Sequence, residues 1–285
     1  MVCLVAIGKA FGLAAATQDY VFPKPDMYCQ LADGWERFAI SLAFGRLPGN
    51  AWGFWMTFAY EQDMAAPASA WLASQKLLVK REFPTPWGVC DLVGCSLNGN
   101  KVRKRLILGQ RKALRSQLRV HVLSLIPDRS EGRAVSLDEL HRRFGGHLDR
   151  GRIEQELEKL IEGRFVEQID GQTYSRHNRW MPLHKRLVAV ELKLVRTDDA
   201  FVQAVNNLGF ADESYVALPA DRARRLAKSK SRSAFTARGI GLLAVGPDDC
   251  RVVLKARPMR RHADSPIQHY CVERFWQPHI RGGRP

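Results

Sequence analysis

One apolar segment of the chain, Arg186–Leu194 (RLVAVELKL), carries a glutamate and a lysine two residues apart. Its composition predicts a strand, and because side chains alternate between the two faces of a strand, Glu191 and Lys193 project to the same side. Two charged groups on a core strand are costly unless they are paired or bind a metal ion. An ExK triplet is also common as a surface pair on half-exposed strands, so its meaning depends on the strands around it.

A second charge within an apolar strand occurs one hundred residues before Glu191. Asp91 lies within Trp87–Leu97 (WGVCDLVGCSL), which is expected to form a hairpin with Leu77–Phe83. Two carboxylates and one lysine suit a hard cation, because Mg²⁺ prefers oxygen ligands and keeps several of its waters. In such a site Lys193 would orient or help to deprotonate the attacking water and would offset charge on a scissile phosphate.

The residues between these two strands are predicted to form a separate unit. Helical spacing of apolar residues predicts helices over Gln110–Ile126 and Arg150–Glu162, and a capping box opens a short helix from Ser136 to Phe144. An Asp-Gly turn predicts a β-hairpin over residues 164–176. Three helices followed by a hairpin is the order of a winged helix, whose third helix and wing usually contact DNA. The expected contacts to nucleic acid are Arg142, Arg143, Arg150, Arg152, Arg164, Arg176 and Arg179.

The charge of the chain favours a polyanionic partner. The formal net charge is +15, and Lys101–Arg119 holds eight basic residues and no acidic one. This excess favours nucleic acid ahead of a membrane surface, and no apolar run reaches transmembrane length. The third helix of the predicted winged helix carries four glutamates, however, which is unfavourable for a phosphate-binding face. A winged helix that contacts another protein is therefore the alternative.

The spacing of the cysteines and the absence of a phosphate-binding loop disfavour two classes of protein, those with a structural zinc site and ATPases. The six cysteines show no CxxC pair and no dense disulfide framework, which fits a reducing cytoplasm and disfavours a structural zinc site. The sequence has no GxxxxGK[ST] phosphate loop, so an intrinsic ATPase is disfavoured.

Strands and helices alternate on both sides of the predicted winged helix. The expected order is α-β-β, insertion, β-α-β-α-β-β, which indicates an α/β sheet with mixed strand directions. We expect a core over residues 61–100 and 184–258, an inserted winged-helix domain over residues 105–180, an N-terminal helical and aromatic region over residues 1–60, and a basic C-terminal tail over residues 259–285. The remaining predicted elements are helices over Ala65–Lys76, Asp198–Phe210 and Asp221–Lys230 and strands over Tyr215–Leu218, Gly239–Val245 and Arg251–Ala256.

Two segments, Lys80–Leu97 and Leu187–Pro219, resemble the core of the PD-(D/E)xK (restriction-endonuclease-like) nuclease superfamily. In that superfamily a hairpin supplies the aspartate and the next strand supplies (D/E)xK. The helix that follows often carries a glutamine, matched here by Gln203. The chain departs from the pattern in two places: Cys90 stands where the family has proline, and the predicted winged helix lengthens the connection to the ExK strand.

The resemblance implies a restriction-endonuclease-like mixed sheet flanked by helices. It also implies a metal-dependent endonuclease or nuclease subunit that cleaves double-stranded DNA, with Mg²⁺ or Mn²⁺ held by Asp91 and Glu191. The family often adds an acid from the first helix, for which Glu61 is the candidate and Glu82 the rival. Members often act as dimers or beside a helicase or ATPase partner.

The alternative is a catalytically inactive, nuclease-like DNA-binding scaffold in a repair, defence or mobile-element complex. The residues needed for catalysis are all present, which argues against this alternative. A role in RNA processing is disfavoured because no RNA-binding signature occurs in the sequence.

Overall fold

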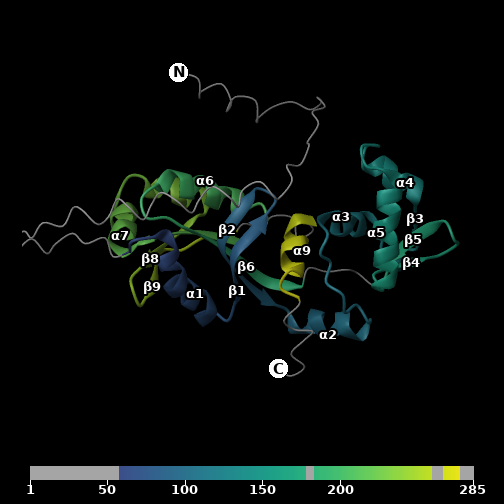
Figure 1. The fold of residues 1–285 in the computed structure, drawn as a ribbon, viewed down its shortest axis with the longest axis horizontal. Helices are drawn as coiled ribbons and strands as arrows, with labels where there is room; N and C mark the ends of the chain where they lie inside the picture. The colour runs from purple at the N-terminus through teal and green to yellow at the C-terminus, as the bar shows by residue number, and fades with distance from the viewer. Residues whose placement is uncertain (1–57, 178–182, 259–265, 277–285) are drawn as a thin grey trace, which may run out of the picture. The chain divides into compact units, whose positions relative to one another are not determined.

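The computed structural model describes residues 58–177, 183–258 and 266–276 (Figure 1). The predicted N-terminal helical and aromatic region lies outside these residues except for its last three, and Arg179 lies outside them as well. No helix in the described part of the chain has the length and apolar character that crossing a membrane requires.

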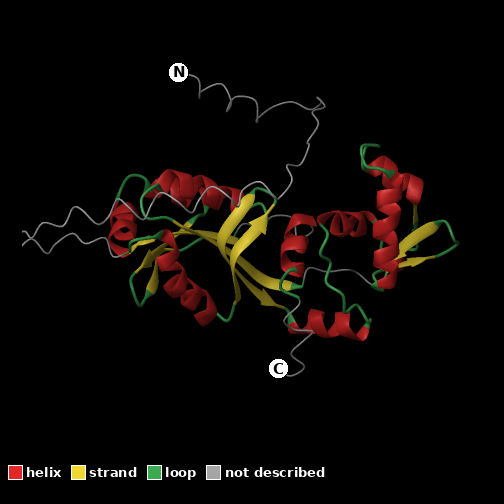
Figure 2. Cartoon of the chain, in the orientation of Figure 1, coloured by secondary structure: helices red, strands yellow, loops and turns green. Residues whose placement is uncertain are grey.

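A six-stranded mixed sheet is the larger structure in this part of the chain (Figure 2). Its strand order is β1-β2-β6-β7-β8-β9, in which β6, β7 and β8 run parallel and the other neighbours pair antiparallel. The predicted α/β class with mixed strand directions is therefore confirmed. The strands are β1 (Leu78–Thr85), β2 (Gly88–Leu97), β6 (His184–Leu192), β7 (Glu213–Pro219), β8 (Gly241–Val245) and β9 (Cys250–Leu254).

Helices pack on both faces of this sheet, so its central strands are apolar on both sides. Helix α1 (Ala65–Ser74), which follows the 3₁₀ helix η2 (Glu61–Met64), covers one face, on which Val188 and Val190 are buried. On the other face α6 (Thr197–Asn207), α7 (Ala220–Lys228) and α8 (Arg232–Arg238) cover β7 and β8. Helix α9 (Pro266–Glu273) covers the β2 end of that face. A charged residue in β6 is therefore buried unless it lies at the end of the strand.

Between β2 and β6 the chain forms a smaller structure with a hydrophobic core of its own, which we call the helical unit (residues 117–177). It contains α3 (Gln117–Leu125), α4 (Leu137–Arg143) and α5 (Arg150–Glu162). A three-stranded sheet of order β3-β5-β4 packs beside them, formed by β3 (Val135–Ser136), β4 (Val166–Gln168) and β5 (Thr173–Arg176). The predictions for α4 and α5 are confirmed. Helix α3 starts seven residues later than predicted, because residues 110–116 form the connection to the core.

Three helices were not predicted, and one of them corrects the expected domain boundaries. Helix α2 (Gly99–Ile107) begins shortly after β2, because the side chain of Asn98 accepts bonds from the backbone N–H groups of Asn100 and Lys101 and caps it. Helix α8 follows a basic stretch that has little apolar periodicity. Helix α9 lies within residues 259–285, the expected basic tail, and buries Phe275 and Trp276 just beyond its end. That expectation is wrong for residues 266–276, because these residues belong to the core.

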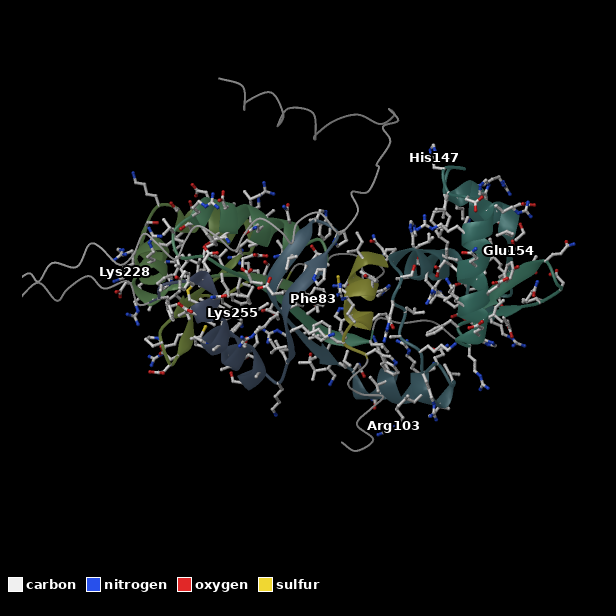
Figure 3. The ribbon with its side chains drawn as sticks, viewed as in Figure 1. Phe83, Arg103, His147, Glu154, Lys228 and Lys255 are labelled. Atoms are coloured by element: carbon white, nitrogen blue, oxygen red, sulfur yellow. The ribbon has the colours of Figure 1, made fainter. Side chains whose placement is uncertain are left out.

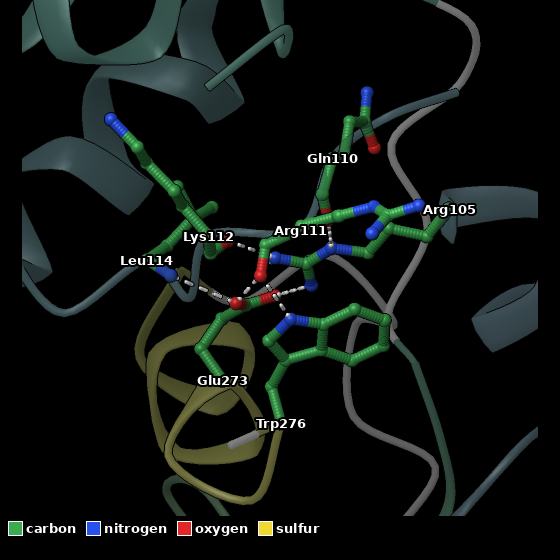
Figure 4. Close-up of polar contacts among 7 residues, drawn as sticks. All are labelled: Arg105, Gln110, Arg111, Lys112, Leu114, Glu273 and Trp276. Atoms are coloured by element: carbon green, nitrogen blue, oxygen red, sulfur yellow. Dashed lines mark hydrogen bonds and ion pairs between the residues drawn. The ribbon is translucent and has the colours of Figure 1, made fainter. Parts of the chain in front are cut away.

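A buried ion pair connects α2, the connecting segment and α9 (Figure 4). Arg105 and Glu273 are 3% and 2% exposed, and both terminal nitrogens of the guanidinium contact the carboxylate. Arg105 also donates to the carbonyls of Gln110 (3.2 Å) and Lys112 (2.9 Å), and Glu273 accepts the N–H of Leu114 at 3.0 Å. The two charges are therefore almost fully bonded where water does not reach them.

We expect Glu273→Ala to lower the free energy of unfolding by about 3 to 5 kcal/mol, because it leaves the Arg105 guanidinium buried without its counter-charge. Urea unfolding followed by circular dichroism measures the change. Lys112→Ala is the control: Lys112 and Glu162 form an exposed pair (67% and 64% exposed), and its loss should change stability by about 1 kcal/mol or less. Equal effects of the two substitutions would contradict the role of the buried pair.

Candidate metal centre

The predicted acidic residues meet where β2 and β6 separate. The antiparallel pairing of these strands ends at Leu92 and Val190, so the next residues along the same register, Asp91 and Glu191, lie opposite each other. The N–H of Leu192 donates to Asp91 Oδ2 at 2.7 Å. The Asp91 carboxylate thus accepts the Leu192 N–H, which has no backbone acceptor on β2 once the two strands separate. This bond holds Asp91 at the point of separation, which we call the opening of the sheet.

Glu191 is buried at this opening, with 2% of its surface exposed. Asn207, the last residue of α6, donates from Nδ2 to Glu191 Oε1 at 2.6 Å. The same amide lies 3.5 Å from Cys90 Sγ. Burial raises the pKa of the Cys90 thiol well above its usual value, and the charge of Glu191 adds to the shift. A neutral thiol and an amide therefore surround the inner side of the Glu191 carboxyl group.

Lys193 is the first residue after β6, at the carboxyl end of the strand. Its N–H still donates to the Ala217 carbonyl of β7 at 3.1 Å, which fixes the backbone. Its Nζ contacts Glu61 Oε2 at 2.9 Å, and Glu61 Oε1 accepts the N–H of Leu194 at 3.3 Å. The structure therefore brings Glu61 to the site, as a partner of Lys193.

The charges of these groups depend on one another. Burial raises the pKa of Glu191 to about 7; the bond from Asn207 opposes this, and the charge of Asp91 adds to it. Burial also raises the pKa of Asp91, against the bond from Leu192 and the charge of Lys193, and the two carboxyl groups are within hydrogen-bonding reach of each other. Burial lowers the pKa of Lys193, but the three acids Glu61, Asp91 and Glu191 together raise it by more than burial lowers it. The net shift of the pKa is therefore upward. The ammonium group stays charged at neutral pH beside a carboxyl pair that tends to hold a proton.

This donor set fits a divalent cation in part. A cation can replace the proton that the Asp91–Glu191 pair holds, and Mg²⁺ needs only one or two carboxylates when water and phosphate oxygens complete its shell. Within the described residues no group of three or more His, Cys, Asp or Glu side chains is placed to hold a metal ion. The predicted set of Asp91, Glu191 and Glu61 is therefore not assembled, because Glu61 bonds to Lys193 instead.

The residue of α6 that contacts the acidic pair is Asn207. Gln203 lies one turn earlier on an exposed part of the helix, so its role as an active-site residue stays a prediction. Asn207 continues the buried stripe of Ala200 and Ala204 at helical spacing. A polar amide within an apolar stripe is the sequence signal that could have identified it.

Glu82, the rival acidic candidate, lies on the strand that neighbours Asp91. It is exposed, and its backbone is left-handed, with φ of 45°. By the register of the flanking pairs, Arg81 with Leu92 and Phe83 with Cys90, it stands opposite Asp91. A left-handed non-glycine residue is strained, so the hairpin is distorted at the level of the carboxyl pair.

The arginines predicted to contact nucleic acid occupy different settings in the helical unit. Arg142 and Arg152 are exposed, and we find no ion pair for either in the described part of the chain. Arg143 and Arg150 pair with Glu139 and Asp138. Arg164 packs against Gly109, which follows α2, and Arg176 lines a hollow of about 490 Å³ together with Arg133 and Arg143.

Comparison with protein-family models, with curated proteins and with solved structures finds no match to this chain. We therefore infer function from the residues of the site and from the charge of the surfaces around it.

In the metal-free protein we expect Glu191 to make stability depend on pH. Its pKa is raised from 4.5 to about 7 in the folded state. Between pH 4.5 and 7 the folded protein therefore binds more protons than the unfolded chain. The stability that protonated Glu191 contributes is fully present below about pH 4.5 and is lost as the pH rises toward 7. Glu191→Gln should remove that part of the slope. Urea unfolding in EDTA between pH 5 and pH 8 measures it.

The matched control is Glu154→Gln, which changes an exposed glutamate of α5 in the helical unit (Figure 3). It should leave the slope unchanged. Identical pH slopes in the wild-type protein and in Glu191→Gln would show that this carboxyl group does not titrate differently on folding.

Proposed function

We propose that the chain is a metal-dependent DNA endonuclease, or the nuclease subunit of a larger assembly. The observation that supports this most is the opposition of Asp91 and Glu191 where β2 and β6 separate, with Lys193 at the end of the same strand. The strand order agrees with a restriction-endonuclease-like fold: a hairpin supplies the aspartate, an antiparallel neighbour supplies ExK, and a helix leads to a parallel strand.

In this proposal Asp91 and Glu191 would hold Mg²⁺ or Mn²⁺. When bound, the cation would lower the pKa of a water molecule and neutralise charge on the scissile phosphate. Lys193 keeps its proton because Glu61 and the two carboxyl groups raise its pKa. It therefore acts as a cation that orients the water and stabilises phosphate charge, a more specific role than accepting a proton. Glu61 positions its ammonium group.

A winged helix would place duplex DNA for this site. Three helices and a β-hairpin in the helical unit support the assignment, with α5 as its third helix and β4 and β5 as the wing. The exposed cations Arg142 and Arg152 are the strongest candidates for contacts with phosphate, because neither is already paired with an acid among the described residues.

One observation favours the second candidate, a catalytically inactive DNA-binding scaffold. Glu191 is 2% exposed and already accepts a bond from Asn207. The carboxyl pair is thus partly satisfied by the protein itself. The two candidates differ in whether DNA is cut when a divalent cation is supplied.

We expect Asp91→Ala and Lys193→Ala each to reduce Mg²⁺-dependent cleavage by about a hundredfold or more, because the first removes a ligand of the cation and the second removes a positive charge that stabilises the transition state. Their affinity for DNA should change little. Nicking of plasmid and cutting of linear DNA, with Mg²⁺ or Mn²⁺ and with EDTA, measure cleavage, and a mobility shift measures binding.

Two exposed residues supply matched controls for these substitutions. Lys185 lies on the same strand as Glu191, and Asp198 lies on α6. The variants Lys185→Ala and Asp198→Ala should both retain activity. Full activity of both Asp91→Ala and Lys193→Ala would end the proposal. A mobility shift without cutting, across substrates and metals, would instead favour the scaffold.

The double substitution Arg142→Ala with Arg152→Ala should weaken binding to duplex DNA and reduce its dependence on salt. If each arginine neutralises one phosphate, the slope of log K against log salt falls in magnitude by about 2. Arg133→Ala, which removes an arginine already paired with Glu131, should have a smaller effect. An unchanged slope in the double variant would mean that this face of the helical unit does not contact DNA.

A further inference from the structure

Helices α7 and α8 carry a concentration of positive charge that the proposed site does not use. Residues 221–238 contain seven Lys or Arg and one Asp. Arg224 lies 3.7 Å from that acid, Asp221, and Arg222 donates to a backbone carbonyl. The other five cations have no ion pair with any described residue; they are Arg225, Lys228, Lys230, Arg232 and Arg238. Like charges at helical spacing repel one another, so an anionic partner would stabilise this surface.

A shallow hollow opens between the end of α7 and the body of α8. It has a volume of about 610 Å³ and is lined by three cations, three hydroxyl side chains and an alanine, without any carboxylate. The cations are Lys230, Arg232 and Arg257, and the hydroxyl residues are Ser229, Ser233 and Thr236. Arginine, lysine and small hydroxyl side chains are the groups that proteins use against the phosphates of nucleic acid.

The first turn of α7 lies at the edge of the sheet that carries the proposed metal centre. The hollow lies farther along, near the amino end of β8, where the Arg257 N–H donates to the Gly239 carbonyl. Helix α7 starts directly after β7, the strand whose Ala217 carbonyl bonds to Lys193 N–H. From its first turn, Arg222 Nη1 donates to the Leu194 carbonyl at 2.6 Å. Arg225 follows Arg222 at helical spacing, and Lys228 ends the helix (Figure 3). A chain of phosphates that passes the carboxyl end of β6 would therefore meet α7 next.

The apolar residues of these helices face inward. Ala223 and Phe235 are buried in the core beneath them. None of the exposed large apolar residues in the described part of the chain falls between residues 220 and 238. A helix that inserts into a lipid surface needs an exposed apolar face beside its basic one. The surface therefore fits a soluble polyanion better than a membrane.

We propose that the α7–α8 surface, with its hollow at Lys230 and Arg232, binds the sugar–phosphate backbone of duplex DNA. It would hold the substrate beyond the metal centre, toward the amino end of β8. This inference rests on the proposed function for its substrate, but it concerns binding and is testable without cleavage.

The test uses the full chain in EDTA, so that no cutting occurs, with a labelled duplex of about 30 base pairs as the probe. Fluorescence anisotropy across a series of NaCl concentrations gives the affinity and its salt dependence. For Lys230→Gln with Arg232→Gln we expect affinity to fall on the order of tenfold near 0.1 M NaCl, and the slope of log K against log salt to fall in magnitude by about 2.

The matched control is Lys112→Gln with Lys185→Gln, which removes the same net charge. Lys112 is already paired with Glu162, and Lys185 lies at the beginning of β6, away from the carboxyl end of the strand. This control should lose at most about threefold in affinity. The charge-conserving exchange Lys230→Arg with Arg232→Lys should keep both the affinity and the slope.

Each outcome separates this inference from the proposed function. Wild-type affinity in the Gln double variant would overturn the inference, even if the wild-type protein cuts DNA. Weakened binding in that variant, combined with no cutting by the wild-type protein under any metal, would support the inference and count against the endonuclease. Loss of binding to phosphatidylserine-containing vesicles with unchanged binding to DNA would overturn it in favour of a lipid surface.

Discussion

The hydrogen bond from the Leu192 N–H to the Asp91 carboxylate marks the point on which the rest of the site depends. Strands β2 and β6 stop pairing there, and a side chain takes over the role of the backbone. Because the two strands run antiparallel, ending their ladder at Leu92 and Val190 places Asp91 and Glu191 at the same level. The distorted backbone of Glu82 on β1 lies at that level too. The opening of the sheet and the acidic pair are thus one feature.

Packing on both faces of the sheet buries the inner side of this opening, where Glu191 lies. Helix α1 covers one face of β6, and α6 brings Asn207 against Glu191 from the other. Burial raises the pKa of both carboxyl groups, which disfavours their separate ionisation. Lys193, just after the end of the strand, supplies a positive charge beside them, and Glu61 binds its ammonium group. The pair is thereby suited to exchange a proton for a divalent cation, the property that the proposed endonuclease needs.

The connection between the core and the helical unit has a different physical basis. Arg105 and Glu273 form a buried, multiply bonded pair, and Trp276 adds a bond from Nε1 to the Arg111 carbonyl at 3.0 Å. The Arg105 guanidinium also lies 4.2 Å from the Trp276 ring centroid and 5.0 Å from that of Phe165, which comes from the helical unit. Residues from three distant segments of the chain therefore meet around one cation, and the segment between core and unit is anchored as it leaves α2.

The sequence by itself determined which segments are strands or helices wherever the apolar pattern was regular, as in β2, β6 and α5. It also placed Asp91 and Glu191 within apolar strands, because alternation and helical spacing are local properties. Only the tertiary structure decided that these two residues face each other, since that depends on register between strands one hundred residues apart. It also decided that Glu61 binds Lys193, that Asn207 and not Gln203 contacts Glu191, and that α9 belongs to the core. Each of these depends on partners that are distant in sequence, and a local pattern does not say which partner a side chain meets.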